Sequence, residues 1–173
     1  ALIKDYPNPP LLYNINGACY KALGQLDAAV KSYEKALAIK PDFAEAHSNL
    51  GNTLKELGQL DAAVKSYEQA LAIKPDYADA HSNLGNTLKE LGQLEKAVKS
   101  YEQALAIKPD YAKAHCNLGA TLQELGQLDA AIKSFEKALA IKSDFADAWH
   151  NVFYTAKALG VSSTQNVWLE SYK

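Results

Sequence analysis

Apolar residues recur at helical spacing along most of this chain, and residues 44–77 show the pattern most clearly. Apolar positions in that segment recur mostly three or four residues apart, first at Ala46, Leu50, Leu54 and Leu57, then at Leu60, Val64, Tyr67, Leu71 and Ile73. Such spacing places side chains on one face of a helix. Gly58 interrupts the pattern and Pro75 ends it, because glycine suits the left-handed residue after a helix and proline cannot continue one. The segment therefore predicts two helices joined by a short turn, and β-branched residues are too sparse for strands.

The same pattern returns at a fixed interval of 34 residues. All nine glycines fall into two series with this step, namely Gly17, Gly51, Gly85 and Gly119, and Gly24, Gly58, Gly92, Gly126 and Gly160. A fixed period in this range indicates a stacked array of repeats. The predicted units are residues 10–43, 44–77, 78–111 and 112–145, then a partial repeat, 146–160, that we expect to cap the array. We expect residues 1–9 to be the remnant of a preceding repeat or an N-terminal extension, and residues 161–173 to be a short helix or a linker.

Gly51 and its equivalents lie in the middle of predicted helices, where glycine costs about 1 kcal/mol relative to alanine. We expect the missing side chain to permit close approach of a neighbouring helix. Phe153 stands at this position in the partial repeat and removes that space. At the start of a predicted helix, Asp42 with Glu45 resembles a capping box, in which the first side chain accepts a hydrogen bond from the helix N-terminus.

The repeat resembles the tetratricopeptide repeat, a unit of the same length with aromatic residues, Leu-Gly, two alanines and a proline at set offsets. The matching residues of the second repeat are His47, Leu50, Gly51, Leu54, Ala63, Tyr67, Ala70 and Pro75. The resemblance implies an all-α fold, a right-handed α-solenoid of stacked antiparallel helix pairs. It also implies that the first helix of each repeat lines an extended concave groove. His47 departs from the aromatic residue of the family, which Tyr13 and Trp149 restore in the end repeats.

Composition narrows the classes of function. The formal net charge is −2, near neutral, which argues against a nucleic-acid partner because such proteins usually carry a basic patch. No stretch approaches the roughly 20 apolar residues of a membrane span. Cys19 and Cys116 lie in the first and fourth repeats, too far apart for a disulfide. We therefore expect reduced thiols and a cytoplasmic location.

The sequence offers no catalytic or metal site. His47, His81 and His115 occupy one repeat position, so about 10 Å should separate neighbours, whereas a shared metal needs ligand atoms about 2 Å away. We interpret these histidines as packing residues. Every glycine belongs to the repeat, so none remains for a phosphate-binding loop. We therefore predict no enzymatic activity, no metal and no cofactor.

Binding is better supported, because asparagines recur on the predicted first helices. Asn49, Asn83, Asn117 and Asn151 step by 34 residues, and Asn52 and Asn86 extend the series. One amide donates two hydrogen bonds and accepts two, so a ladder of amides can hold the backbone of an extended peptide largely regardless of its sequence. The series resembles the asparagine ladder in the repeats of O-linked N-acetylglucosamine transferases. The alternative is that each asparagine ties one repeat to the next.

Lys113 completes the set of predicted peptide-binding residues. In a known clamp for two carboxylates in tetratricopeptide repeats, the positions of Asn52, Asn83 and Lys113 match. Ser48 and Asn117 stand where that clamp has cations, so we expect a weak grip on a carboxylate. Further positions expected to line the groove are Ser48, Ser82 and Cys116. Lysine–glutamate pairs on the same helices are expected to form a solvated face.

We predict a protein–protein interaction scaffold that binds an extended peptide or a partner protein in the concave groove, with roughly micromolar affinity. One alternative is a substrate-recruiting segment of a larger enzyme, such as a glycosyltransferase or sulfotransferase. The absence of methionine and the incomplete repeat at the start favour that context. Another alternative is self-assembly into a homo-oligomer by end-to-end stacking, because Leu11 and Leu12 lack a preceding repeat to cover them.

Overall fold

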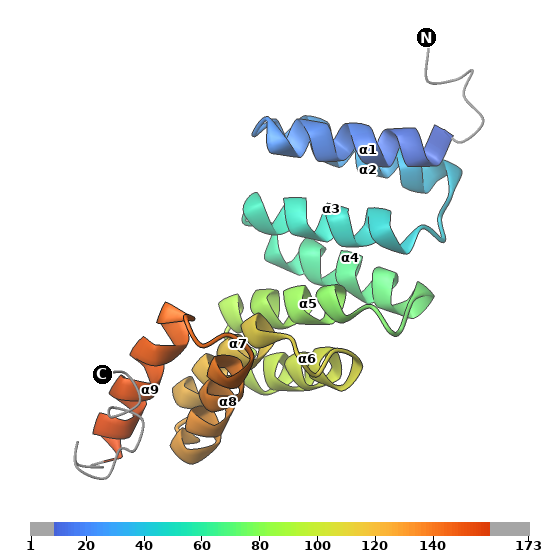
Figure 1. The fold of residues 1–173 in the computed structure, drawn as a ribbon. Coiled ribbons are helices and arrows are strands. Elements are labelled where there is room, and N and C mark those ends of the chain that lie inside the picture. The colour runs from blue at the N-terminus through green and yellow to red at the C-terminus, as the bar shows by residue number, and fades with distance from the viewer. Residues whose placement is uncertain (1–8, 160–173) are drawn as a thin grey trace. The chain divides into compact units, whose positions relative to one another are not determined.

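A computed structural model of the 173-residue chain describes residues 9–159, which contain nine α-helices and no strand (Figure 1). The helices are α1 (Pro9–Ala22), α2 (Leu26–Ile39), α3 (Ala44–Glu56), α4 (Leu60–Ile73), α5 (Ala78–Glu90), α6 (Leu94–Ile107), α7 (Ala112–Glu124), α8 (Leu128–Ile141) and α9 (Ala146–Ala158). The chain divides into two compact units, Ala1–Gln93 and Leu94–Lys173. The short helix or linker expected at 161–173, and residues 1–8 of the expected N-terminal remnant, lie outside the described residues.

Consecutive helices pack against each other within each unit. In the first unit, α1 packs on α2 and α3 on α4, and the second helix of each pair also contacts the first helix of the next pair. In the second unit, α7 packs on α8 and is flanked by α6, while α8 contacts α9. Short turns join the helices of a pair, so their directions are antiparallel. The predicted all-α fold of stacked helix pairs is confirmed. Across residues 9–159, every helix is too short or too polar to span a membrane.

The turn inside each pair depends on a glycine with positive φ. Gly58 has a φ of +73° and directly follows Leu57, the C-cap residue of α3. The Gly58 N–H donates to the Lys55 carbonyl at 2.9 Å, and the Gln59 N–H donates to the Leu54 carbonyl at 2.9 Å. These two bonds form the Schellman motif that satisfies the last carbonyls of a helix. The predicted role of Gly58 in ending a helix is confirmed.

The mid-helix glycine makes room for an aromatic ring of the partner helix. A Cβ atom at Gly51 would lie 2.8 Å from Cε1 of Tyr67. The Tyr67 side chain is fully buried on α4, as are Ala63 and Ala70 one turn away on either side. The missing side chain of Gly51 therefore makes room for the Tyr67 ring of the partner helix.

The capping box predicted at Asp42 is wrong. The N-cap residue of α3 is Phe43, and no side chain caps this helix. Asp42 lies in the turn after Pro41, two residues before the first helical residue. Asp42 therefore lies one residue before the N-cap position. Only from the N-cap position does a side chain readily accept hydrogen bonds from the N–H groups of the first helical turn.

The last described helix, α9, packs against α8 and α7. Its buried residues are Ala148, Val152, Thr155 and Ala156. Phe153, which replaces the mid-helix glycine, is 52% exposed. The described residues therefore leave this face of α9 largely uncovered.

Candidate functional site

The asparagines predicted to bind a peptide lie on the first helix of each pair. Asn49 and Asn52 are one turn apart on α3, and Asn83 and Asn86 are one turn apart on α5. All four side chains are half-buried. Leu54, on another side of α3, is buried. The asparagines therefore belong to the polar side of amphipathic helices whose apolar side faces the core.

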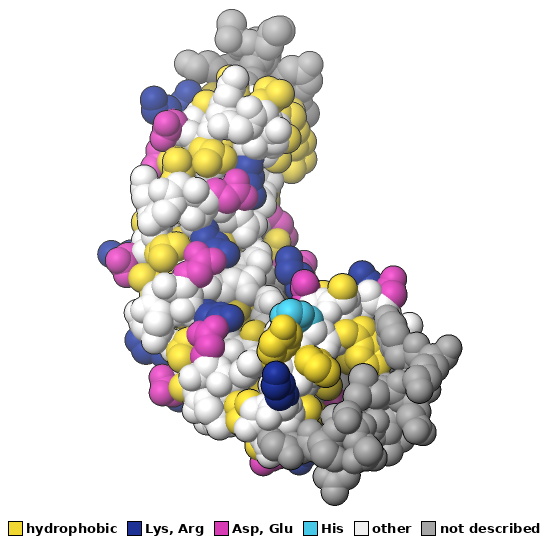
Figure 2. Space-filling view, turned by 90° about the vertical axis from the view of Figure 1, so that its left-hand side faces the viewer, with side chains coloured by type: hydrophobic (Ala, Val, Ile, Leu, Met, Phe, Trp, Pro, Cys, Tyr) yellow, Lys and Arg dark blue, Asp and Glu magenta, His cyan; other side chains and the backbone are white. Residues whose placement is uncertain are grey.

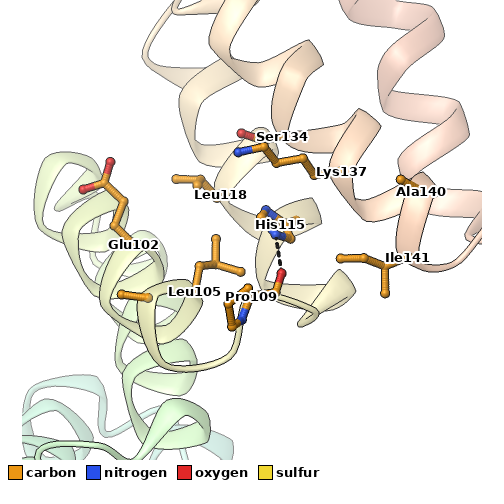
Figure 3. A pocket seen from close by; sticks show the side chains of 10 residues that line it. Glu102, Leu105, Pro109, His115, Leu118, Ser134, Lys137, Ala140 and Ile141 are labelled. Carbon is orange, nitrogen blue, oxygen red and sulfur yellow. Dashed lines mark hydrogen bonds between the residues drawn. The ribbon is translucent and has the colours of Figure 1, made fainter.

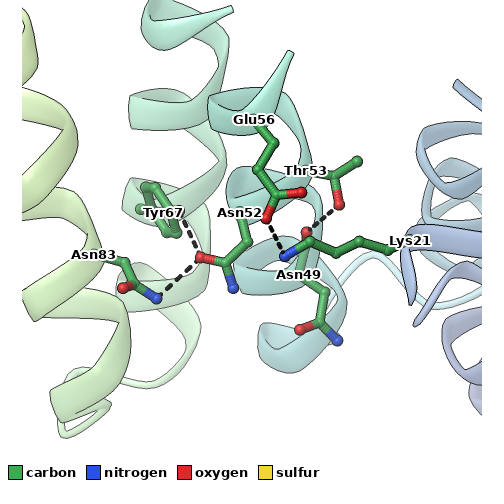
Figure 4. Close-up of polar contacts among 7 residues, drawn as sticks. All are labelled: Lys21, Asn49, Asn52, Thr53, Glu56, Tyr67 and Asn83. Atoms are coloured by element: carbon green, nitrogen blue, oxygen red, sulfur yellow. Dashed lines mark hydrogen bonds and ion pairs between the residues drawn. The ribbon is translucent and has the colours of Figure 1, made fainter. Parts of the chain in front are cut away.

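Asn52 and Asn83 meet across the junction between α3 and α5. Asn83 Nδ2 donates to Asn52 Oδ1 at 3.0 Å, and the Tyr67 hydroxyl donates to the same oxygen at 2.7 Å (Figure 4). Burial raises the pKa of Tyr67 well above its ordinary value of 10, so the hydroxyl keeps its proton and remains a donor. Thr87 on α5 donates to the backbone carbonyl of Asn83 at 2.9 Å. One polar cluster thus joins α3, α4 and α5.

The junction between α1 and α3 uses a different pair of amides. Asn49 Nδ2 donates to Asn14 Oδ1 at 3.1 Å. Ala18 stands at the repeat position that Asn52 occupies one repeat later, so it offers no amide there. Asn14 occupies the repeat position of Ser48, one of the positions expected to line the groove, but its contact with Asn49 was not predicted. At both junctions of the first unit an asparagine therefore does tie one repeat to the next.

These contacts leave hydrogen-bonding capacity unused. Asn52 Oδ1 accepts two hydrogen bonds, whereas both N–H groups of its amide are unspent among the described residues. Asn49 and Asn83 each donate one side-chain N–H. The other N–H and the side-chain oxygen of each amide have no hydrogen-bond partner among residues 9–159. The amides that join the repeats therefore retain the donors and acceptors that a peptide backbone needs.

Lysine and glutamate side chains pair across the same junctions. Lys21 Nζ lies 2.8 Å from Glu56 Oε1, and Lys55 Nζ lies 2.7 Å from Glu90 Oε1. Figure 2 shows basic and acidic side chains next to each other over this part of the chain, separated by uncharged surface. The lysines are about one-quarter exposed and the glutamates about half exposed, so each pair contributes little to stability but cancels its own charge. The expected solvated face is thus a row of ion pairs between repeats.

In the second unit, Lys113 and Asn117 lie one turn apart on α7, and Asn151 lies on α9. Lys113 is exposed, whereas Asn117 and Asn151 are half-buried. The asparagines of this unit thus share the exposure of those in the first unit, whereas Lys113 is more exposed.

Asn151 differs from Asn83 in its surroundings. At the junction of α7 with α9, Ala120 and Phe135 occupy the repeat positions of Asn52 and Tyr67. Neither an accepting amide nor a phenolic hydroxyl is present at those positions. Within the described residues, the Asn151 side chain makes no hydrogen bond, and only its backbone carbonyl accepts one, from Thr155. Among residues 9–159, the whole Asn151 amide is therefore without a hydrogen bond.

Three residues expected to line the groove are buried instead. The exposed fractions of Ser48, Ser82 and Cys116 are 3%, 1% and 4%. Each directly precedes an asparagine of the ladder, and one residue turns a helix by about 100°. That rotation moves these side chains from the polar side towards the neighbouring helices. The prediction that they contact a ligand is wrong.

A family model described as "TPR repeat" matches residues 17–58, 51–92 and 85–126, and one described as "Tetratricopeptide repeat" matches residues 112–145. The chain belongs to the tetratricopeptide repeat family. The family predicted from the repeat pattern is thereby confirmed. No curated protein matches the chain in sequence.

Solved tetratricopeptide repeat structures share the fold. The chain superposes on a MamA protein with a TM-score of 0.82 at 26% identity, covering 88% of this chain and 83% of that one. Residues 41 to the end of MamA from Desulfovibrio magneticus RS-1 give a TM-score of 0.83 at 20% identity, with 90% and 88% covered. YrrB, described as a TPR protein with an unusual peptide-binding site, gives 0.79 at 23% identity, with 94% and 84% covered. Membership of the tetratricopeptide repeat family supports a protein-interaction role for the chain.

In these tetratricopeptide repeats, the position held by His47 ties the first helix to the preceding turn. A ring N–H there donates to the carbonyl six residues earlier, from His47 to Pro41 and His81 to Pro75 at 2.9 Å, from His115 to Pro109 at 3.0 Å, and from Trp149 to Ser143 at 2.8 Å. The acceptor is a backbone carbonyl, so Ser143 serves as well as proline. The recurring six-residue spacing was the signal in the sequence that could have revealed this role.

The chemistry of the site is hydrogen bonding by amides. Among residues 9–159, no three His, Cys, Asp or Glu side chains are grouped so that they could hold a metal ion. In the first unit, the charged groups beside the amides include lysines and glutamates already paired with each other. Such a surface can recognise alternating N–H and C=O groups.

Proposed function

We propose that this tetratricopeptide repeat chain is a non-enzymatic scaffold that binds an extended peptide of a partner protein along the first helices of its repeats. The observation that carries the proposal is the unused hydrogen-bonding capacity of Asn49, Asn52 and Asn83, held in place by their contacts between repeats. Preorganised donors and acceptors bind without the cost of ordering flexible side chains. Asn86 on α5 is a further proposed contact in the first unit, and Lys113, Asn117 and Asn151 are the proposed contacts on α7 and α9 of the second unit.

The charge balance of the face favours recognition of a peptide backbone. The pairs Lys21–Glu56 and Lys55–Glu90 neutralise each other, so the amides lie between groups of no net charge. Such a face selects weakly for the charge of peptide side chains and leaves the backbone as the main ligand. The resemblance to the asparagine ladder of O-linked N-acetylglucosamine transferases and the peptide-binding site named for YrrB support the same proposal.

The test is a titration of the whole chain with a pool of synthetic peptides about 12 residues long, which span about 40 Å when extended. Asn151→Ala removes an amide that makes no described contact, so it should weaken binding about two- to tenfold and leave the melting temperature unchanged. Asn83→Ala should weaken binding and also lower the melting temperature, because it breaks the contact with Asn52.

Tyr33→Phe is the matched control. Tyr33 is buried on α2, and among the described residues no asparagine of the site bonds to its hydroxyl, so the variant should change the melting temperature and not the affinity. Affinity that stays constant through Asn151→Ala and Asn83→Ala, or that falls equally in Tyr33→Phe, would contradict the proposal.

Self-association is a second candidate, favoured by the exposed apolar face of α1. Leu11 and Ile15 lie one turn apart on α1 and Leu23 lies directly after its end, and they are 42%, 49% and 71% exposed. Burying such a stripe against another copy is favourable at about 25 cal/mol per Å². Light scattering over a concentration series would show a mass that rises with concentration, and Leu11→Ser with Ile15→Ser would restore the monomer. A constant monomer mass would contradict this candidate.

A further inference from the structure

A pocket opens in the second unit on a surface that carries none of the asparagines of the proposed site. Its volume is about 620 Å³, within the range of ligand-binding pockets. Its walls come from α6 and α8, with α7 between them (Figure 3). Both α6 and α8 pack on α7, but no Cα atoms of α6 and α8 lie within 8 Å of each other among the described residues. The two helices therefore leave a groove between them.

The base of the pocket is apolar and held in place. Leu118 of α7 is buried, and Leu105 of α6 and Ile141 of α8 lie on either side of it. His115 beside them is also buried, and its Nε2 donates to the Pro109 carbonyl at 3.0 Å. Ile141 is 42% exposed, so the pocket offers apolar surface to a ligand. Because His115 is anchored to the turn, the pocket exists before any ligand enters.

Charged side chains of opposite sign stand on opposite walls. Lys137 extends from α8 over the pocket mouth towards Leu118, and Glu102 projects from α6 on the other side (Figure 3). Neither Lys137 nor Glu102 forms an ion pair within residues 9–159. The repeat position of Lys137 holds Lys35 on α2, Gln69 on α4 and Gln103 on α6, and α4 is the helix that corresponds to α8 in the surface between α2 and α4. The unpaired lysine therefore distinguishes this groove from the equivalent surface between α2 and α4.

We propose that this groove binds an amphipathic helix of a partner protein through an apolar side chain with a carboxylate one turn away. The apolar side chain enters the pocket over Leu105, Leu118 and Ile141, and the carboxylate pairs with Lys137 Nζ. Charge complementarity identifies the ligand, because the α8 wall is cationic and unpaired while the α6 wall carries Glu102. Glu102 repels an acidic residue on its side and favours a basic one, which sets the direction of the bound helix. A third helix lying in the space between two others is a known mode of recognition.

The test uses a displayed library of helical peptides about 15 residues long, selected on the whole chain and counter-selected on Lys137→Glu. We expect the selected peptides to share an apolar residue with Asp or Glu one turn away. In titrations, Lys137→Gln should weaken such a peptide about two- to fivefold, as expected for an exposed ion pair. Ile141→Ser should weaken it about tenfold by removing exposed apolar surface without disturbing the core.

Lys133→Gln is the matched control, because Lys133 lies one turn earlier on α8, is exposed and does not line the pocket. It should leave the affinity unchanged, and Asn151→Ala should do so too, which separates this groove from the proposed peptide-binding face. A peptide in which the acid is replaced by Lys should bind Lys137→Glu better than the unaltered chain. Equal losses in Lys133→Gln and Lys137→Gln, or selected peptides without an acid, would overturn the proposal. A chain that dimerises and becomes monomeric in Ile141→Ser would also overturn it, because the occupant would then be a second copy.

Discussion

The amide of Asn83 donates to the amide oxygen of Asn52 at 3.0 Å, joining residues 31 positions apart on two different helices. The two side chains lie on the face that we propose as the peptide-binding site, so a single contact serves both the assembly of the repeats and the preparation of that surface. An amide oriented by its neighbour presents its remaining donors and acceptors in a defined direction.

We expect this contact to be measurable in stability. Asn52→Ala and Asn83→Ala should each lower the free energy of unfolding by about 1 kcal/mol, because each removes one partner of a half-buried hydrogen bond. The double variant should lose less than the sum of the two single variants, since both remove the same bond. Urea denaturation of the four proteins gives the coupling energy, and strictly additive losses would show that the contact contributes nothing.

Tyr67→Phe should destabilise the first unit by about 1 kcal/mol, because its hydroxyl donates to Asn52 in a fully buried setting. Phe135 on α8 already lacks the hydroxyl at the equivalent position, where Ala120 replaces the accepting asparagine. Phe135→Tyr should therefore gain no stability and should lose some, since a buried hydroxyl would have no amide at Ala120 to bond. Thermal unfolding measures the stability of both variants, and a Phe135→Tyr chain more stable than the unaltered chain would contradict this account.

Gly51→Ala should destabilise the chain by roughly 1–3 kcal/mol, even though alanine is the better helix former. The added Cβ would lie 2.8 Å from the Tyr67 ring, closer than atoms in contact tolerate. In a Tyr67→Ala background the ring is gone, and the same substitution should become stabilising. Denaturant titrations of the four proteins check the change of sign, and a loss of equal size in both backgrounds would mean that the ring is not the cause.

Acid should destabilise the second unit through His115. Burial lowers the pKa of His115 below its ordinary value of 6.5, against the raising effect of the hydrogen bond to Pro109, and the charge of Lys137 lowers it further. The folded state therefore takes up this proton less readily than the unfolded chain. It follows that the free energy of unfolding keeps the contribution of this group above about pH 6.5 and loses it as the pH falls below that value.

His115→Trp isolates this effect. Trp149 shows that a tryptophan at the same repeat position can donate to the turn carbonyl, and the tryptophan side chain does not take up a proton in this pH range. The variant should lose stability less steeply than the unaltered chain between about pH 7 and pH 5. Denaturation curves over this range compare the slopes, and parallel slopes would exclude His115 as the titrating group.

Much of the architecture could be predicted from local signals. Residues equivalent to Gly58 and Pro75 recur every 34 residues and marked where helices end. Both residues act through their own backbone geometry, which depends little on distant residues. Asp42 shows the limit even of local reasoning, because a shift of one residue in the start of α3 takes a side chain out of capping position.

The amino-acid order alone thus established the repeats, the helices within them and the side of each helix on which Asn49, Asn52 and Asn83 lie. Folding was needed to select the partners of those amides, since Asn49 bonds to Asn14 whereas Asn83 bonds to Asn52, although the two donors occupy the same place in the repeat. The tertiary structure was also needed to show that Asn49 is half-buried whereas the neighbouring Ser48 is buried. The reason is physical: periodicity specifies the direction of a side chain about its own helix, but a hydrogen bond depends on the packing of two helices whose residues lie more than 30 positions apart.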